Sequence, residues 1–500
     1  MSEFPSLGSK DDSPRPAPDS PDSQIEDSGL QPGPRHIKGG RDLTTGPIFA
    51  TLVLFTLPTL ASNILHSLNG SINSIWVAHF LGEAALAATA NANIIMFLMF
   101  SIIFGLGMAA NVVVGQAFGR GDLDAARRAF GTAMGFCFVL ALIIAVGGFL
   151  WSERILALLS TPPEVFRLAK LYLHYTFFGL PGVMVLIMLM MGLRGGGDAM
   201  TPLWFMILSV VLDIGLNPVF ILGLGPAPEM GIAGSAFASG VSMYISLAAM
   251  VAYIYARDLP LRLRGREWHY LKPDWGLMRI IAGRGLPMGL QMVIMSLSTL
   301  VIIGFVNREG TTTVAAFAAA QQLWNYIQMP AMAVGGAVSA MAAQNIGAGK
   351  WDRVERTTGI AIGVNVVMTG SLIALVMLFE RPILALFLEG GGEAIEIGTH
   401  LMHIINWSYL LFSIAMVMFG TMRANGVVIP PLIILTISLF FVRIGFYYVS
   451  YPFMGVDGLW WGFTVSTAVS LVLGFAYYRW GRWREASLGV PSRPPLRGVS

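Results

Sequence analysis

Charge is scarce in this chain of 500 residues, because only 12% are Asp, Glu, Lys or Arg whereas 55% are hydrophobic. Soluble domains are roughly a quarter charged, so an ordinary soluble fold is excluded. The net charge of +3 is too small to indicate a nucleic-acid partner, and none is expected. Cys137 is the only cysteine, which excludes intramolecular disulfides and cysteine metal centres. The Gly-rich Lys-Ser or Lys-Thr phosphate loop is also missing, so we expect neither ATP as the driving force nor any other cofactor.

Long apolar segments make up most of the chain after residue 47. Each is long enough to cross roughly 30 Å of hydrocarbon. Twelve such spans are predicted, at approximately 48–80, 84–115, 130–151, 168–192, 202–223, 232–256, 278–305, 313–343, 357–379, 398–421, 430–452 and 458–479. The sequence therefore predicts an all-α polytopic protein embedded in a lipid bilayer.

The polar stretches divide the chain into five regions. Residues 1–46 contain seven prolines and seven serines but no apolar period, which predicts a disordered cytoplasmic tail. Two six-helix lobes are predicted over 47–256 and 278–480. A polar and basic cytoplasmic linker joins them over 257–277, and residues 481–500 form a second cytoplasmic tail.

The two predicted lobes repeat the same short motifs. Several single residues and tetrapeptides recur after 224 to 229 residues: Gln116-Ala-Phe-Gly119 as Gln344-Asn-Ile-Gly347, Gly231-Ile-Ala-Gly234 as Gly455-Val-Asp-Gly458, Pro58 as Pro287, and Arg194 as Arg423. Because each repeat holds an even number of spans, both enter the membrane in the same sense. They are then related by a pseudo-two-fold axis along the membrane normal. Such duplication is typical of secondary transporters, although a channel or a membrane enzyme can also contain a repeat.

Basic residues gather in the connections that follow the even-numbered spans. These connections carry Arg120, Arg127, Arg128, Arg194, Arg257, Arg262, Arg264, Arg266, Lys272, Lys350, Arg353, Arg356 and Arg423. The opposite connections carry Arg154, Arg167, Arg308 and Arg381 with several acids. The positive-inside rule therefore predicts that both termini are cytoplasmic. We expect the membrane to be the inner membrane of a bacterium.

These motifs resemble those of the multidrug and toxic compound extrusion (MATE) family across about residues 47–480. The similarity rests on Leu57-Pro58, Ile75-Trp-Val-Ala-His-Phe-Leu-Gly82, Gln116-Ala-Phe-Gly119, Leu193-Arg-Gly-Gly-Gly-Asp198 and Asn217-Pro218. The resemblance implies a two-lobed exporter that opens a central cavity alternately to each side. Such a protein exchanges small organic compounds, often cationic drugs or toxic metabolites, for H⁺ or Na⁺. The loop patterns are closer to the DinF-like branch. We expect a monomer and no enzymatic activity.

The chain departs from the family pattern where coupling residues are expected. DinF-like relatives carry an acid in the first helix, where this chain has Asn73. They also have Asn, three residues and then Asp in the fifth helix, where this chain has Asp213 followed by Asn217. NorM-like relatives place an acid in the seventh helix at the position of Met295. A coupling site is therefore expected in the first lobe, where it depends on a single carboxylate.

Asp213 is the strongest candidate for ion coupling. It lies eleven residues inside its span, which is about 16 Å deep at 1.5 Å per residue. A charge at that depth requires a partner, a proton or a bound cation. Asn217 lies on the same helix face, and His66, Asn69 and Asn73 form one stripe on the first span.

We therefore predict that these five residues share a polar pocket at which the coupling ion binds. Oxygens from Asp213, Asn217 and Asn73 would suit Na⁺. Asp213 near His66 would suit H⁺, which we favour because the acid of the first helix is absent. The alternative is purely structural hydrogen bonding between the two helices. No other metal site is expected, since His400 and His403 lack a third ligand nearby in the sequence.

Candidate substrate contacts lie mainly in the second lobe. The amides and the aromatic and thioether side chains that could meet an organic cation are Gln291, Gln321, Asn325, Trp324, Met184 and Met188. Core packing is the alternative for each. Arg443 is the repeat counterpart of the Asp213 region, and an arginine so deep requires a partner or a wet cavity. It is expected to contact an anionic group of the substrate or a carboxylate across the lobes. The alternative is a structural ion pair or a side chain that extends towards the membrane surface.

Two further functions compete with an exporter. A flippase for lipid-linked saccharides has a related fold, but such proteins tend to have fourteen spans and a more basic cavity. A polytopic membrane enzyme would require a second carboxylate near Asp213 or a complete set of metal ligands, and the sequence provides neither.

Overall fold

The computed structural model describes residues 41–158, 161–388, 392–486 and 488, and most of these residues are helical. The first lobe consists of α1 Ile48–Leu81, α2 Glu83–Gly119, α3 Leu123–Leu158, α4 Pro163–Gly195, α5 Met200–Leu222 and α6 Ile232–Ala256. The second lobe begins with α7 Trp275–Val306, α8 Thr311–Gly347, α9 Trp351–Leu378, the short α10 Glu380–Ala385 and α11 Gly392–Ala424. It ends with α12 Ile429–Thr436, the π-helical segment η3 Ile437–Val442, α13 Arg443–Met454 and α14 Asp457–Trp480. Short 3₁₀ helices are η2 Gly265–Leu271 and η4 Arg482–Arg484.

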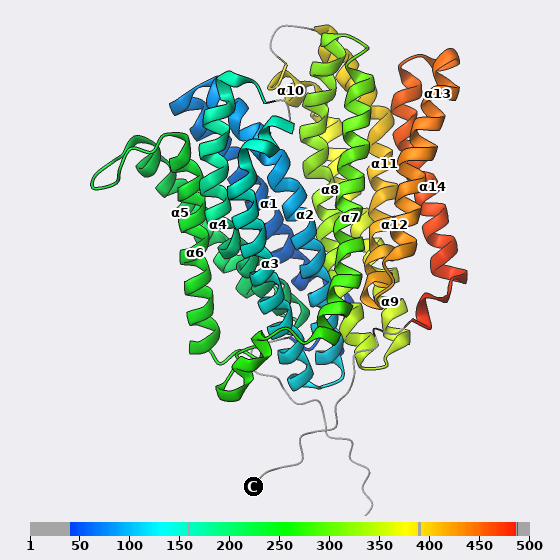
Figure 1. Cartoon of the computed structure of the whole chain (residues 1–500). Helices are drawn as coiled ribbons and strands as arrows, with labels where there is room; N and C mark the ends of the chain where they lie inside the picture. Colours follow the sequence, from blue (N-terminus) through cyan, green and yellow to red (C-terminus); the bar gives the residue numbers. More distant parts are fainter. Residues whose placement is uncertain (1–40, 159–160, 389–391, 487, 489–500) are drawn as a thin grey trace, which may run out of the picture. The chain divides into compact units, whose positions relative to one another are not determined.

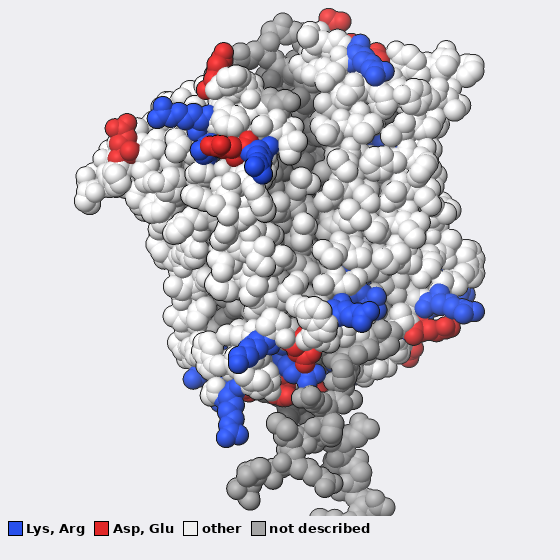
Figure 2. Space-filling model, in the orientation of Figure 1, with Lys and Arg blue, Asp and Glu red and all other residues white. Residues whose placement is uncertain are grey.

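Most of the long helices in the described ranges suit a bilayer. Eleven helices are long and apolar enough to cross it, when the continuous α12–η3–α13 is counted as one. The twelfth long helix is α8, whose middle carries Gln321, Gln322, Asn325 and Gln328. Because α8 packs against α1, α2, α9 and α11, its polar middle need not face lipid. An uncharged band lies between the charged residues near the two ends of the molecule (Figure 2).

The two lobes pack in the same pattern. In the first lobe, α2 packs against α3 and α4, α4 against α6, and α5 contacts α1 and α6. In the second lobe, α8 packs against α9 and α11, α11 against α14, and α12–η3–α13 contacts α7 and α14. Figure 1 shows the blue-to-green helices of the first lobe beside the second lobe, whose helices run from the green α7 to the red α14. At their interface, α2 contacts α7 and α8, while α8 also contacts α1.

One duplicated glycine motif shows that the sequence repeat is also a backbone repeat. Gly231 precedes α6 with φ 54° and ψ −130°, and Gly455 precedes α14 with φ 57° and ψ −135°. A positive φ of this kind is accessible to glycine at little cost. The same turn therefore leads into the last helix of each lobe.

The predicted tail boundary at residue 46 is wrong, because residues 41–46 pack against both lobes. The Leu43 side chain is fully buried. Its N–H donates to Gln344 Oε1 at 3.1 Å, and its carbonyl accepts from Asn345 Nδ2 at 3.2 Å. Side chains of α8 thus satisfy the backbone of a polar segment that has no regular structure of its own. The rest of the predicted tail, residues 1–40, lies outside the described residues.

The predicted linker and the second tail also contain structure. Within 257–277, η2 packs on α3, and Arg127 pairs with Glu267 at 2.8 Å. Burial and the hydrogen bond from Tyr270 to Asp124 raise the pKa of Tyr270 to about 12. The linker ends where the Asp274 side chain caps α7 by accepting from two backbone N–H groups. In the second tail, Trp483 of η4 is fully buried, and residues 487 and 489–500 lie outside the described residues.

Candidate functional site

A buried carboxylate in the first lobe is held by three helices. Asp213 of α5 is 1% exposed. Its Oδ2 accepts hydrogen bonds from Asn69 Nδ2 at 2.7 Å and Asn73 Nδ2 at 2.9 Å, both from α1. Its Oδ1 accepts from Asn217 Nδ2 and from Ser239 Oγ of α6, each at 2.9 Å. The prediction that α1 and α5 meet across a polar pocket therefore describes the geometry, and sequence reasoning missed only the serine from α6.

The electrostatics of this cluster favour a cation. Four donors reach the carboxylate, whereas no Lys or Arg among the described residues lies within ion-pair distance of it. The buried amide oxygens Asn69 Oδ1 and Asn217 Oδ1 have no hydrogen-bond partner among the described residues. Buried acceptors without donors are costly, at about 1–3 kcal/mol each. A proton would neutralise the charge, and a small cation would both neutralise it and be bound by the unused oxygens.

His66, which was predicted at the coupling site, makes no hydrogen bond to the Asp213 cluster in this structure. The imidazole is exposed and stacks on Phe100 of α2, with ring centroids 5.6 Å apart. His66, Asn69 and Asn73 lie on one face of α1, but different helices pack against different parts of that face. At Asn69 and Asn73 the neighbour is α5, whereas at His66 it is α2.

A second polar site lies in a pocket of the second lobe. Three of the predicted substrate contacts on α8, namely Gln321, Trp324 and Asn325, line it together with Arg443. Trp324 donates its indole N–H to Asn406 Oδ1 at 3.0 Å, which fixes the ring. Met295 of α7 and Tyr409 of α11 also line this pocket, and neither was predicted to contact substrate.

Arg443 carries a positive charge deep in the second lobe. The side chain is 7% exposed. Its Nε donates to Ser466 Oγ at 3.0 Å, its NH1 to Ser298 Oγ at 3.4 Å, and its Cζ lies 4.3 Å from the centroid of the Phe463 ring. No carboxylate of the described residues lies within ion-pair distance, so the structural ion pair considered for this residue is not present there. A charge at the bilayer centre costs at least about 2.5 kcal/mol, which leaves a strong preference for an anion.

Three predicted substrate contacts lie elsewhere, and the structure corrects them. Met184 and Met188 of α4 are 0% and 1% exposed in the core of the first lobe. Gln291 of α7 is 5% exposed and donates to the carbonyl of Val428 at 3.2 Å, outside the described pocket. Composition alone could not separate these side chains from cavity-lining ones, because methionines and amides also serve packing between helices.

The duplicated Gln-x-x-Gly motifs meet each other at the end of the bundle that carries the basic connections. Gln116 at the end of α2 donates to the carbonyl of Ala424 at 2.8 Å, and Gln344 at the end of α8 donates to that of Gly195 at 2.9 Å. A Cβ on Gly119 would lie 1.9 Å from the carbonyl oxygen of Gln344, and one on Gly347 would lie 2.1 Å from that of Gln116. Each glycine therefore permits a backbone contact between the lobes, in a symmetric arrangement we call the interlobe latch.

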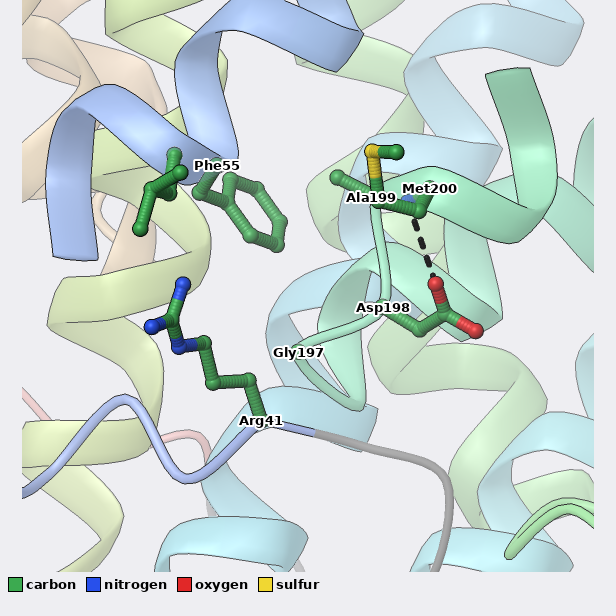
Figure 3. Close-up of a pocket in the computed structure, with 7 residues that line it drawn as sticks. Arg41, Phe55, Gly197, Asp198, Ala199 and Met200 are labelled. Carbon is green, nitrogen blue, oxygen red and sulfur yellow. Dashed lines mark hydrogen bonds between the residues drawn. The ribbon is translucent and has the colours of Figure 1, made fainter. Parts of the chain in front are cut away.

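The N-terminal segment crosses this latch. The N–H of Arg41 donates to the carbonyl of Gly197 in the first lobe at 3.4 Å, whereas Arg353 of the second lobe donates to the carbonyl of Thr45 at 2.8 Å. Figure 3 shows Arg41 beside the turn of Gly197 and Asp198, in a small pocket that Phe55 also lines. Asp198 itself accepts from the N–H of Met200 at 3.1 Å at the start of α5. The N-terminal segment thus connects the two lobes at this end of the molecule.

Comparison with known proteins then identifies the architecture. The sequence model of the MatE family matches the chain twice, over residues 58–219 and 287–449. The chain belongs to the MATE family. The predicted membership and the predicted fold of two six-helix lobes are therefore confirmed, while the DinF-like branch stays a prediction.

Similar proteins cover most of this MATE chain. "Probable multidrug resistance protein YoeA" of Bacillus subtilis (strain 168) is 34% identical over 443 residues, 88% of this chain and 95% of that protein. The "FAD transporter" of Shewanella oneidensis is 26% identical over 351 residues, 70% of this chain and 77% of that protein. The crystal structure of the Vibrio cholerae MATE transporter VcmN in the bent form has a TM-score of 0.80 at 21% identity, over 88% of this chain and 97% of that chain.

The two matches of the MATE model also show that Arg443 lies, to within one residue, at the position in the second lobe that Asp213 has in the first. Their starts are 229 residues apart and their ends 230. The π-helical segment η3, which lies between, accommodates one additional residue in a helix. With that residue counted, Arg443 corresponds to Asp213, and Ser298, which contacts Arg443, corresponds to Asn69 at an offset of 229.

Proposed function

We propose that this MATE protein is a secondary antiporter that exports small organic compounds in exchange for a monovalent cation bound at Asp213. The observation that carries the proposal is the isolated carboxylate, which has four donors, no ion-pair partner among the described residues, and two unused amide oxygens beside it. Multidrug resistance is the property named for the Bacillus subtilis relative. Because the family and these relatives are transporters, we infer that the chain is not an enzyme.

We propose H⁺ as the coupling ion, since one carboxylate is neutralised by one proton and no second acid comes from α1, where Asn73 stands. One observation favours Na⁺ instead. Asn69 Oδ1 and Asn217 Oδ1 are buried acceptors close to Asp213, and oxygen ligands are what a hard cation requires. The experiment below therefore compares both gradients.

Transport by alternating access requires that the lobes separate at one end and then at the other. The interlobe latch supports a closed state at the basic end, which the positive-inside rule assigns to the cytoplasm together with both termini. For release of a compound to the outside, this end stays closed. For loading, Gln116 and Gln344 must lose their interlobe hydrogen bonds. We propose that this cycle takes place within one chain in the inner membrane of a bacterium.

The decisive experiment is ethidium efflux in everted membrane vesicles under an imposed proton or sodium gradient. We expect efflux by the unmodified protein under one of the two gradients. Asp213→Asn should lose this efflux, because an amide has no negative charge with which to bind the coupling ion. Glu153→Gln is the matched control, since Glu153 is an exposed acid of α3 that pairs with Lys170 and makes no contact with Asp213. Efflux by the control should equal that of the unmodified protein.

Two results would contradict the proposal. Normal gradient-driven efflux by Asp213→Asn would place coupling elsewhere and leave Asp213 with a structural role. If the unmodified protein moved no ethidium under either gradient, the proposal of multidrug export would be wrong. Transport of lipid-linked saccharides by a flippase would then be the better hypothesis.

A further inference from the structure

Arg443 lacks the partner that a buried guanidinium normally has. Its two hydrogen bonds go to hydroxyl groups, those of Ser298 and Ser466, and its third neighbour is the ring of Phe463. Neither a hydroxyl nor an aromatic ring carries the negative charge that would neutralise it. Buried arginines are normally paired with carboxylate or phosphate, which accept two parallel N–H bonds. Among the described residues, no acid supplies that pair.

The guanidinium lines an open pocket and is not sealed within the core. Gln321 and Asn325 lie one turn apart on α8 and line the same pocket, so their amides could bind further polar groups. Trp324 and Tyr409 add two aromatic faces, with ring centroids 6.0 Å apart and planes 30° apart. The pocket thus combines one cation, neutral amides and flat apolar surface. This set matches an aromatic compound that bears an anionic group.

A methionine of α7, Met295, lines the same pocket as Arg443. Met295 lies three residues before Ser298 on α7, which places both on the same side of that helix. An acid at position 295 would be within one helical turn of the side chain that contacts Arg443. With methionine there, the positive charge stays available to a ligand.

We propose that this pocket binds the anionic group, a carboxylate or a phosphate, of an aromatic substrate, with Arg443 as the residue that selects for negative charge. The proposal rests on the proposed export function, whose substrate class it narrows from small organic compounds to aromatic compounds that bear an anionic group. Arg443 would donate to the anion from the N–H groups that the two serines leave free, and Trp324 and Tyr409 would contact the ring.

The test is equilibrium binding of carboxyfluorescein, an aromatic polyanion, to the purified full-length protein in a neutral detergent, followed by fluorescence anisotropy. We expect the unmodified protein to bind the dye and Arg443→Gln to bind it at least tenfold more weakly, because the charge is lost. Arg443→Lys should fall between them, since an ammonium keeps the charge but not the bidentate geometry. Arg308→Gln is the control, because Arg308 is an exposed arginine outside the pocket.

Ethidium efflux measured on the same variants separates this proposal from the proposed function. An unfolding temperature of Arg443→Gln in detergent equal to that of the unmodified protein would show that the variant folds, so loss of dye binding would be specific. If Asp213→Asn binds carboxyfluorescein normally but exports nothing, the two sites have separate roles, as expected. If the unmodified protein binds the dye through Arg443 but no ethidium moves under either gradient, the export function fails while the anion site stands.

Several outcomes would overturn the anion site. The first is no dye binding by the unmodified protein, and the second is equal binding by Arg443→Gln. The third is loss of both dye binding and ethidium efflux in the Gln and Lys variants alike, which would make Arg443 a structural residue. The fourth is displacement of the dye by phosphatidylglycerol without any export of carboxyfluorescein. That result would assign the pocket to a lipid headgroup and not to a soluble substrate.

Discussion

The two lobes place opposite charges at corresponding positions of a duplicated fold. In the first lobe, Asp213 collects four hydrogen-bond donors from α1, α5 and α6. In the second, Arg443 has two hydroxyl acceptors and an aromatic ring, and it lines a pocket. The carboxylate is nearly saturated by short polar side chains, whereas the guanidinium keeps unused donors. The first arrangement suits a small ion, and the second suits the charged end of a larger molecule.

The helix that carries each charge also differs between the lobes. α5 is a regular α-helix over Met200–Leu222, whereas its counterpart contains the π-helical segment η3 directly before Arg443. A π-turn leaves carbonyl groups without their usual partner, and here the carbonyl of Leu439 accepts from Ser298 Oγ at 3.2 Å. The same serine accepts from Arg443. The π-helical segment therefore supplies a hydrogen bond that orients the serine beside Arg443.

Among the variants that test the difference between the two lobes, deletion of Phe441 should have the largest effect on carboxyfluorescein binding. Phe441 lies in η3 and is 73% exposed, so its loss removes one residue from the helix without emptying the core. A regular helix would then turn Arg443 by about 100° relative to the residues before η3. We expect carboxyfluorescein binding, measured by fluorescence anisotropy, to weaken by about a hundredfold or to disappear.

The substitution Phe441→Ala keeps the residue count and is the matched control, which should bind the dye normally. Normal binding by the deletion variant would mean that η3 does not position Arg443. The unfolding temperature in detergent again separates this loss from unfolding of the lobe.

Met295→Glu should have the next largest effect on carboxyfluorescein binding, because it introduces a carboxylate into the pocket that Arg443 lines. A carboxylate one turn from Ser298 would pair with Arg443 and compete with the anionic dye. We expect binding of carboxyfluorescein to fall about tenfold while ethidium efflux persists.

Met295→Leu, of similar volume and no charge, should behave as the unmodified protein. Unchanged dye binding by Met295→Glu would contradict an accessible charge at Arg443.

Most of the architecture could be predicted from the sequence because the bilayer makes strict demands. The lengths of the apolar segments, the distribution of arginine and the repeated motifs around Gln116 and Gln344 were sufficient to predict twelve spans in two lobes. Residues 41–46 were missed because their order comes from hydrogen bonds with α8, some 300 positions away, and not from any local pattern. Long-range partners of this kind leave no trace in composition.

The sequence predicted which site residues share a helix face, but not which neighbouring helix each face contacts. Helical spacing correctly grouped Asn69, Asn73, Asp213 and Asn217, since each pair shares a helix face. Spacing cannot say which helix a face meets, and so His66 was grouped with them although its ring packs on α2. For Met184 the same spacing fits a cavity wall and a packed core equally well, and the structure places it in the core.

The smallest expected effect comes from removing one hydroxyl in each lobe. Ser239→Ala takes one of four donors from Asp213, and Ser466→Ala takes one of two hydroxyl acceptors from Arg443. A hydrogen bond to a charged group contributes about 1.5–3 kcal/mol, so each variant should unfold at a lower temperature in detergent. Only Ser239→Ala should also change, by several fold, the concentration of coupling cation that gives half-maximal ethidium efflux. Ser466→Ala should leave that concentration unaltered, because its hydroxyl contacts the arginine of the other lobe. An equal shift in both variants would mean that the two charges act as one site, and the assignment of ion to Asp213 and anion to Arg443 would then be wrong.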